Sequence, residues 1–350
     1  MRLRRIAVFR ALQLGDVLTA LPAVRAVRDC FAPAHLTLVA QPWAHELPGR
    51  LAWLDDFLAF PGHPQLPEQS HDPAALASFE REIRARRFDV AVQMHGDGRV
   101  SNRIVAGFGA PLVAGFHPAS APTPDPARFV PWPETGREVE RLLRLPLHLG
   151  APRPETLVES LSVLQMDYAA LDDIWPGPRA PYVCVHPGAR FPSRRWAAER
   201  FAEVAHALGE VGLTVAVTGG AADAGAVSRF LRDAPADVVD LSGRTSFGAL
   251  TALLAGARLL VANDTGVSHL AAALQTPSVI VCNGSDLARW APVDEDRHRV
   301  LAHPVPCRPC MHLSCPTLHE CARGVSSAAV IQQARVLLAR EHTKETSHAA

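Results

Sequence analysis

Residues 257–274 contain the sequence feature that most constrains the fold of this chain. They begin with a short continuous apolar run, 259–262, which is typical of a strand covered on both faces in a parallel sheet. Asn263 and Asp264 end the run, and the apolar side chains that follow recur at helical spacing. A strand, a tight polar turn and a helix in this order predict one βα unit of a doubly wound α/β fold.

The turn before this predicted helix carries several groups that can act at a helix start. Asp264, Thr265 and Ser268 supply oxygens that can cap the helix, and Gly266 lets a ligand approach the backbone closely. The free N–H groups of a helix start and the helix dipole favour phosphate. Two interpretations stay open here, an ordinary capped turn and a phosphate-binding turn.

Strand and helix patterns alternate along the whole chain. The predicted strands cover residues 5–9, 36–40, 88–93, 112–116, 182–186, 213–218, 238–241, 259–262 and 278–282. The predicted helices include residues 16–30, 73–87, 198–211, 222–232 and 246–256. Because strands that alternate with helices of about 10–15 residues form parallel sheets, two such series predict two doubly wound domains facing each other.

The length of 350 residues also favours two domains over one. We expect a first domain over residues 1–170 and a second over 171–340, because residues 161–181 contain a Pro-, Gly- and Asp-rich stretch typical of a linker. Residues 118–133 carry many prolines and predict a long loop. Residues 341–350 predict a disordered tail.

Composition excludes some classes of protein. The 35 basic and 35 acidic residues cancel, so no nucleic-acid partner is expected. No apolar run approaches the roughly 20 residues of a membrane span, and the first residues do not form a signal peptide. We therefore expect a cytoplasmic protein. Clustered arginines, as in residues 81–87, are typical of solvated helix faces, with contact to an anionic membrane as the alternative.

The turn after the first predicted strand lacks the GxGxxG fingerprint of dinucleotide binding, which disfavours an NAD-dependent enzyme. Gly15 and Asp16 stand instead where the loop enters the helix. A carboxylate at this place can cap the helix or act as a general base, and both interpretations stay open.

Further polar turns follow strands of the second half. Gly188 begins a loop in which Arg194 and Arg195 lie side by side, and guanidinium groups suit a pyrophosphate. Asp223 follows the next strand and could accept hydrogen bonds from sugar hydroxyls, and residues 282–286 form another turn with a glycine. Solvated loops and simple turn chemistry explain these residues as well.

Four cysteines lie close together in residues 307–321. Cys307, Cys310, Cys315 and Cys321 have the spacing C-x2-C-x4-C-x5-C, which predicts a structural metal site for zinc or iron. Reduced surface thiols are the alternative, as are disulfides in an oxidising compartment.

Three motifs in this order, LGDVLTALPAVRAV, HPGARFPSRRW and NDTGVSHLAAAL, resemble those of glycosyltransferase family 9, which includes the ADP-heptose:lipopolysaccharide heptosyltransferases. The resemblance implies an α/β fold of GT-B type, in which two Rossmann-like, doubly wound domains face each other across a cleft. It also implies inverting transfer, without a metal, of a sugar from an ADP-sugar donor. Heptose is the expected sugar, and a lipid-linked core oligosaccharide at the cytoplasmic face of the inner membrane is the expected acceptor. A different acceptor, such as a protein, and a non-catalytic nucleotide-sugar-binding protein are the alternatives.

Carried over motif by motif, the resemblance makes Asp16 the catalytic base. The donor phosphates are expected on Asp264, Thr265 and Gly266. Arg194 stands where this family typically has lysine, so the cation is kept but its shape differs. Further donor-site candidates are Gly188, Arg195, Asp223, Ser268 and His269. No cofactor is expected to be required for catalysis.

Overall fold

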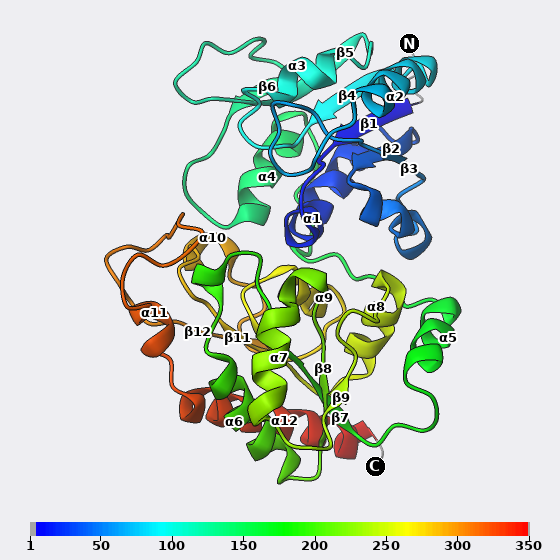
Figure 1. The fold of residues 1–350 in the computed structure, drawn as a ribbon. Helices are drawn as coiled ribbons and strands as arrows, with labels where there is room; N and C mark the ends of the chain where they lie inside the picture. Colours follow the sequence, from blue (N-terminus) through cyan, green and yellow to red (C-terminus); the bar gives the residue numbers. More distant parts are fainter. Residues whose placement is uncertain (1–4, 349–350) are drawn as a thin grey trace. The chain divides into compact units, whose positions relative to one another are not determined.

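The protein is described here by a computed structural model that covers residues 5–348. The chain divides into two compact units, Met1–Glu159 and Ser160–Ala350. Each unit contains one six-stranded parallel sheet (Figure 1). No helix among the described residues is long and apolar enough to cross a lipid bilayer.

The first unit is built on a sheet in the order β3-β2-β1-β4-β5-β6. Its strands are β1 (Arg5–Phe9), β2 (His35–Ala40), β3 (Asp56–Ala59), β4 (Val90–Gln93), β5 (Leu112–His117) and β6 (Phe129–Pro131). Its α-helices are α1 (Leu14–Cys30), α2 (Pro73–Ala85), α3 (Ser101–Ala106) and α4 (Glu138–His148). Helices α1 and α4 pack against each other.

The second unit is built on a sheet in the order β12-β11-β10-β7-β8-β9. Its strands are β7 (Tyr182–His186), β8 (Thr214–Val217), β9 (Val239–Asp240), β10 (Leu260–Asn263), β11 (Ser278–Val281) and β12 (His298–Leu301). Its α-helices are α5 (Gln165–Ile174), α6 (Ala198–Gly209), α7 (Ala224–Asp233), α8 (Phe247–Gly256), α9 (Gly266–Ala273), α10 (Leu287–Trp290), α11 (Glu320–Arg323) and α12 (Ser327–His348).

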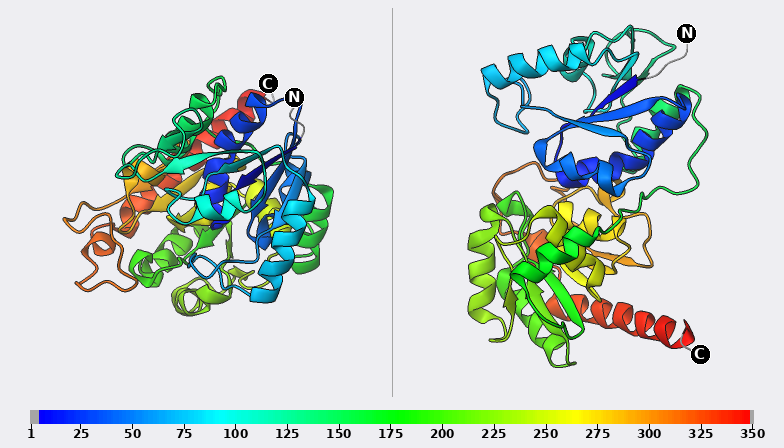
Figure 2. Two further views of the ribbon diagram at one scale, coloured as in Figure 1. Left: turned by 90° about the horizontal axis from the view of Figure 1, so that it is seen from above. Right: turned by 90° about the vertical axis from the view of Figure 1, so that its right-hand side faces the viewer.

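The contacts between helices of the second unit divide them into two groups, and Figure 2 shows one member, α12, as the long red helix near the C-terminal end of the chain. Helix α6 packs with α7 and α12, whereas α8 packs with α5 and α9. Right-handed crossovers explain this division, because the chain winds from β7 toward β9 on one side of the sheet and from β10 toward β12 on the other. Helix α12 also contacts β11, and its Val330, Ala334 and Leu337 are buried in the core.

The predicted strands are confirmed, and the three strands that were not predicted all lie at sheet edges. These are β3 and β6 in the first sheet and β12 in the second. Each is only partly buried, so none carries the continuous apolar run of an interior strand. Strand β6 lies inside residues 118–133, which were expected to form one long loop.

The second unit starts at Ser160, ahead of the expected boundary at 170/171. Helix α5 packs against α8, and the Leu161 N–H donates to the carbonyl oxygen of Ala273 at 3.1 Å, so this segment belongs with the second unit. Helix α12 continues to His348, so the structure replaces most of the expected disordered tail by helix. Residues 341–348 contain neither glycine nor proline, so nothing in their sequence ends the helix. Residues 349–350 lie outside the described chain.

In the first unit, a buried network of hydrogen bonds and ion pairs lies at the end of β1. Arg10 is 1% exposed, and its Nε donates to the carbonyl oxygen of Asp16 at 2.7 Å and its Nη1 to that of Met94 at 2.6 Å. Its Nη2 lies 3.4 Å from Oε1 of Glu138, whose Oε2 accepts from Arg141 at 3.0 Å. One guanidinium thus ties the loop after β1 to the loop after β4 and to helix α4.

We expect Arg10→Ala to lower the free energy of unfolding by about 3–5 kcal/mol, because it removes a buried partner of the Glu138 carboxylate. The control is Arg153→Ala, whose ion pair with Glu140 joins side chains that are 65% and 47% exposed. Its cost should stay below about 1 kcal/mol. Denaturant unfolding of both variants measures the difference, and equal costs would contradict this role of Arg10.

Stability should also depend on pH through His298. This side chain is 3% exposed and its Nδ1 lies 2.8 Å from the Ser278 hydroxyl, and burial lowers the pKa of His298 to about 4. The unfolded chain therefore binds this proton more readily, and the free energy of unfolding should fall by up to about 3 kcal/mol as the pH drops from about 6.5 to 4. His298→Gln should lose this part of the pH dependence, as urea titrations at several pH values would measure. An unchanged slope would contradict the assignment.

Candidate functional site

Each sheet reverses its winding direction beside its first strand. In the first unit this switch point lies between β1 and β4, and in the second between β7 and β10. Ligands of doubly wound sheets bind outside the carboxyl ends of the strands at such points. The segments after β1, β7 and β10 carry Asp16, Gly188 and Asp264, respectively. Candidate residues from the sequence therefore occupy both switch points.

Asp16 lies in the first turn of α1, but it is not the N-cap. Gln13 holds that position, and Asp16 is the third helical residue. Its side chain is half-buried, and among the described residues its carboxylate has no hydrogen bond or ion pair. Its carbonyl oxygen accepts from Arg10 at 2.7 Å. The backbone of Asp16 is therefore held while its carboxylate stays available, which suits a general base better than a cap.

Asn263 joins the two turns at the switch point of the second unit. It is fully buried, its Oδ1 accepts from the Trp196 N–H at 2.9 Å, and its Nδ2 donates to the carbonyl oxygens of Pro187 at 2.9 Å and Gly188 at 3.1 Å. This residue was not among the sequence candidates. An asparagine at the end of an apolar strand is the signal that could have identified it.

The turn between β10 and α9 offers hydrogen-bond donors to an anion. Thr265 is the N-cap of α9, and its buried Oγ1 has no hydrogen-bond partner among the described residues. Ser268 is fully buried and donates to the Thr265 carbonyl oxygen at 2.7 Å, so it shapes the turn and is not available to a ligand. Asp264 is half-buried beside Cys282, and Gly266 begins the helix with a first-turn N–H that no earlier helical carbonyl can satisfy.

The two neighbouring arginines have different surroundings. Arg195 donates to the carbonyl oxygens of Ala189 at 2.9 Å and Ala222 at 3.2 Å, and lies 3.7 Å from the Asp223 carboxylate. Arg194 makes one long hydrogen bond, 3.4 Å to the Cys310 carbonyl oxygen, and its buried Nε has no partner among the described residues. Arg194 is thus the cation with more capacity left for a ligand.

Asp223 lies at the same edge of the sheet, against Gly188. A Cβ atom on Gly188 would come within 2.2 Å of the Asp223 carboxyl group, so a larger residue there would displace this carboxylate. The Asp223 carboxylate accepts from the Gly220 N–H at 3.0 Å and lies 3.9 Å from Nε2 of His186. Burial lowers the pKa of His186, and the Asp223 carboxylate opposes that shift. The last donor-site candidate is His269, whose ring packs edge-on against that of Trp290 with 6.1 Å between the ring centres.

The four clustered cysteines do not lie grouped as the zinc or iron site expected from their spacing would require. Among the described residues no three His, Cys, Asp or Glu side chains are grouped as a metal site requires. Cys310 is buried against Gly284, Cys321 is buried in α11, Cys307 is exposed, and Cys315 lies 3.5 Å from the Thr317 hydroxyl. The spacing predicted a metal site, and the grouping of ligands described here does not support that prediction.

Arg308 is the residue through which the cysteine-rich segment docks on the sheet. It donates to the carbonyl oxygens of Cys282 and Ser285, both at 2.8 Å. These two hydrogen bonds hold the cysteine-rich segment against the turn after β11. The sequence analysis did not single out this arginine, because nothing in its local pattern distinguishes it from a solvated one.

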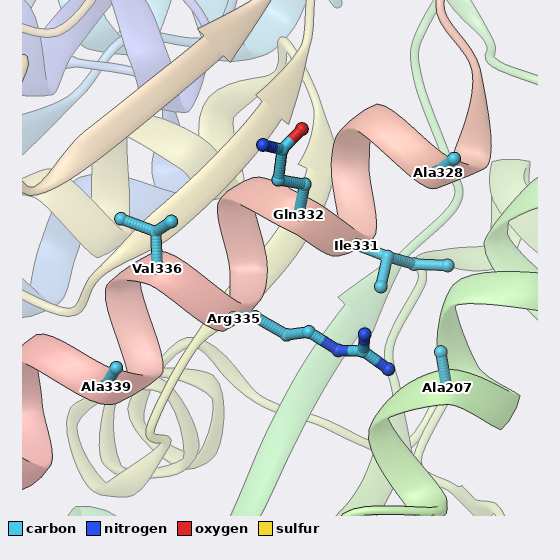
Figure 3. Close-up of a pocket in the computed structure, with 7 residues that line it drawn as sticks. All are labelled: Ala207, Ala328, Ile331, Gln332, Arg335, Val336 and Ala339. Atoms are coloured by element: carbon cyan, nitrogen blue, oxygen red, sulfur yellow. The ribbon is translucent and has the colours of Figure 1, made fainter.

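A groove of about 570 Å³ lies elsewhere in the second unit, between α6 and α12 (Figure 3). Figure 3 shows Ile331 and Arg335 of α12 pointing toward Ala207 of α6. Mostly apolar side chains line it, and none of them is a candidate residue from the sequence. The groove is therefore separate from the candidate site.

Comparison with known proteins identifies curated relatives of this chain. Lipopolysaccharide heptosyltransferase 1 of Pseudomonas aeruginosa is 25% identical over 336 residues, which cover 89% of this chain and 87% of that protein. The chain spans about half the length of two other curated relatives that it matches, 51% and 57%.

Solved structures show the fold. A glycosyl transferase family 9 protein from Veillonella parvula has a TM-score of 0.81 at 21% identity, covering 96% of this chain and 98% of that chain. The ADP-heptose LPS heptosyltransferase II of Escherichia coli has a TM-score of 0.76 at 20% identity, covering 97% and 99%. The expected α/β fold of GT-B type, with two Rossmann-like units, is confirmed.

The sequence model of glycosyltransferase family 9 (heptosyltransferase) matches residues 76–320, more than half of the chain. This match includes the turns after β4, β7 and β10, and thus most of the polar groups described above. The chain therefore belongs to glycosyltransferase family 9.

Proposed function

We propose that this chain transfers heptose from ADP-heptose to a lipopolysaccharide core acceptor, with inversion at the anomeric carbon. The names of the P. aeruginosa relative and of the E. coli structure support this choice of donor and acceptor. The observation that carries the proposal is the Asp16 carboxylate at a switch point, held through its backbone and without a partner among the described residues. Glycosyl transfer needs such a group, because a sugar hydroxyl is a poor nucleophile while it keeps its proton.

In the proposed reaction the acceptor hydroxyl oxygen attacks the anomeric carbon of the donor. The bond from that carbon to the ADP oxygen breaks, and ADP leaves with the electron pair. The hydroxyl proton passes to the Asp16 carboxylate. Because one displacement occurs from the face opposite the leaving group, the anomeric configuration inverts.

The second unit would bind the donor phosphates in this proposal. The Thr265 hydroxyl and the first N–H groups of α9 can donate to them, and Arg194 can supply a positive charge. These groups would stabilise the charge that develops on the departing ADP, so the proposed mechanism assigns no step to a metal. Gly188, Arg195 and Asp223 would shape the same pocket, with His269 at its margin.

The acceptor that we propose is lipid-linked, so the protein would work in the cytoplasm at the membrane surface. Purified protein should be incubated with ADP-heptose, other ADP-sugars, UDP-sugars and GDP-sugars, with truncated lipopolysaccharide as acceptor. We expect nucleotide release and a glycosylated product with ADP-heptose. Transfer only to a protein acceptor would favour that alternative, and donor binding without any transfer would favour a non-catalytic binding protein.

Asp16→Asn tests the base. The amide keeps an oxygen and the shape of the side chain but cannot accept the proton, so we expect transfer to slow by about a hundredfold or more. Binding of ADP, measured by calorimetry, and the melting temperature should match those of the wild type.

The control for this variant is Asp29→Asn, the same substitution on an exposed carboxylate in the last turn of α1. It should leave turnover unchanged. Near-normal turnover by Asp16→Asn would remove Asp16 from the chemistry and leave it a structural role.

Arg194→Ala tests the donor site. Loss of one charge-assisted hydrogen bond to phosphate costs about 1.5–3 kcal/mol, so the Kd of ADP should rise by roughly 10- to 150-fold. Arg194→Lys should recover part of the affinity. The matched control is Arg190→Ala, an exposed arginine of the same loop whose guanidinium lies over Phe191 at 5.6 Å. Equal affinities of wild type and Arg194→Ala would mean that this side chain does not contact the donor.

A further inference from the structure

The switch point of the first unit contains a buried imidazole that the proposed chemistry does not use. His95 follows the carboxyl end of β4 and is 5% exposed. Neither of its ring nitrogens has a hydrogen-bond partner among the described residues. Buried polar atoms in native structures almost always have such a partner, so this ring indicates a place where a ligand or water completes the site.

The position of His95 is tightly fixed, although its ring nitrogens have no hydrogen-bond partner among the described residues. Its carbonyl oxygen accepts from the Gln93 amide and from the Ser101 hydroxyl, both at 2.6 Å. Its ring stacks on Phe9 at the end of β1, with 5.1 Å between the ring centres and 18° between the planes. Such a rigid side chain with open hydrogen-bonding capacity is suited to recognition.

The surroundings of His95 connect it to Asp16. The Arg10 guanidinium donates both to the Asp16 carbonyl oxygen and to that of Met94, which precedes His95. Gln13, the N-cap of α1, donates through Nε2 to the Glu68 carbonyl oxygen at 3.2 Å. A side-chain oxygen of Glu68 lies 3.8 Å from Nε2 of His95. The imidazole and this carboxylate thus border the loop that leads into Asp16.

The loop after His95 is open on one side. Gly96 has a φ of +65°, and a Cβ atom there would meet nothing within 4 Å. Gly98 differs, since a Cβ atom there would come within 2.2 Å of the Phe116 carbonyl oxygen. The loop is therefore anchored at Gly98 and leaves free space at Gly96, the residue that follows His95.

We propose that His95 and Glu68 bind hydroxyl groups of the acceptor saccharide beside Asp16. A neutral imidazole offers one donor and one acceptor, and a carboxylate accepts only. A sugar hydroxyl can donate and accept at once, so a hydroxyl-rich ring matches this pair. This inference rests on the proposed function, because it takes the acceptor to be a saccharide, and it adds a residue that determines acceptor specificity.

The test compares His95→Phe with His95→Gln in the full-length protein. Phenylalanine keeps the stacking on Phe9 but removes both ring nitrogens, whereas glutamine keeps one donor and one acceptor. The probes are deacylated truncated lipopolysaccharide core and, separately, ADP, each titrated by calorimetry. For His95→Phe we expect the Kd of the core saccharide to rise about tenfold or more, as loss of one or two hydrogen bonds predicts, with an unchanged Kd for ADP.

Two further readouts separate recognition from a structural role. The melting temperature of His95→Phe should not fall, because the substitution removes buried polar atoms that lack partners. His95→Gln should recover part of the affinity for the saccharide. In transfer assays the KM for the acceptor should rise while the KM for the donor stays constant.

An unchanged saccharide Kd in His95→Phe would overturn the inference, and so would a lower melting temperature with parallel loss of both affinities. A wild type that binds ADP but not the core saccharide would also overturn it. If the wild type transfers heptose and His95→Phe has the same acceptor KM, this inference fails while the proposed function stands. A wild type that neither binds ADP nor transfers sugar would overturn the proposed function as well.

Discussion

The first unit depends on the charge of one buried guanidinium. Arg10 contacts backbone oxygens after β1 and β4 and a carboxylate of α4, so it joins three elements that are distant in sequence. Two arginines share the single carboxylate of Glu138, and carbonyl oxygens supply further acceptors. In a low-dielectric interior such charged hydrogen bonds have strict geometry, since an unpaired member would be very costly. The first turn of α1, which carries Asp16, is thereby fixed without any contact to the Asp16 carboxylate.

In the second unit a neutral side chain makes the corresponding connection between two turns. The Asn263 amide connects the turns after β7 and β10, where Arg10 connects those after β1 and β4. Because the Asn263 amide is neutral, other residues determine the charge at this site. Arg195 is paired with Asp223, whereas the Arg194 guanidinium has one long hydrogen bond. In the proposed function this site would receive two phosphates, and a cation already engaged in structural contacts would be less available to them.

The sequence predicted the interior strands because both of their faces are buried, which leaves a continuous apolar run. It also predicted one edge strand, β9, but not the edge strands β3, β6 and β12, which are only partly buried and lack that run. Asp16 and Thr265 could be singled out because each is a polar residue in a turn between a predicted strand and a predicted helix. His95 could not, because its significance lies in contacts with Phe9 and Glu68, which are far away in sequence. The cysteine spacing predicted a grouping of thiols that the described residues do not show, since proximity along the chain does not fix where thiols point.

Helix α12 has a consequence for the order in which the protein is built. Its Val330, Ala334 and Leu337 complete a core whose strands begin with β7, much earlier in the chain. All elements of the first unit lie before Glu159, so that unit can fold while the rest is still being synthesised. The second sheet cannot close its core until α12 has left the ribosome. Its apolar surface beside α6 and β11 therefore stays exposed longest, which makes the interval before α12 docks the period of greatest aggregation risk.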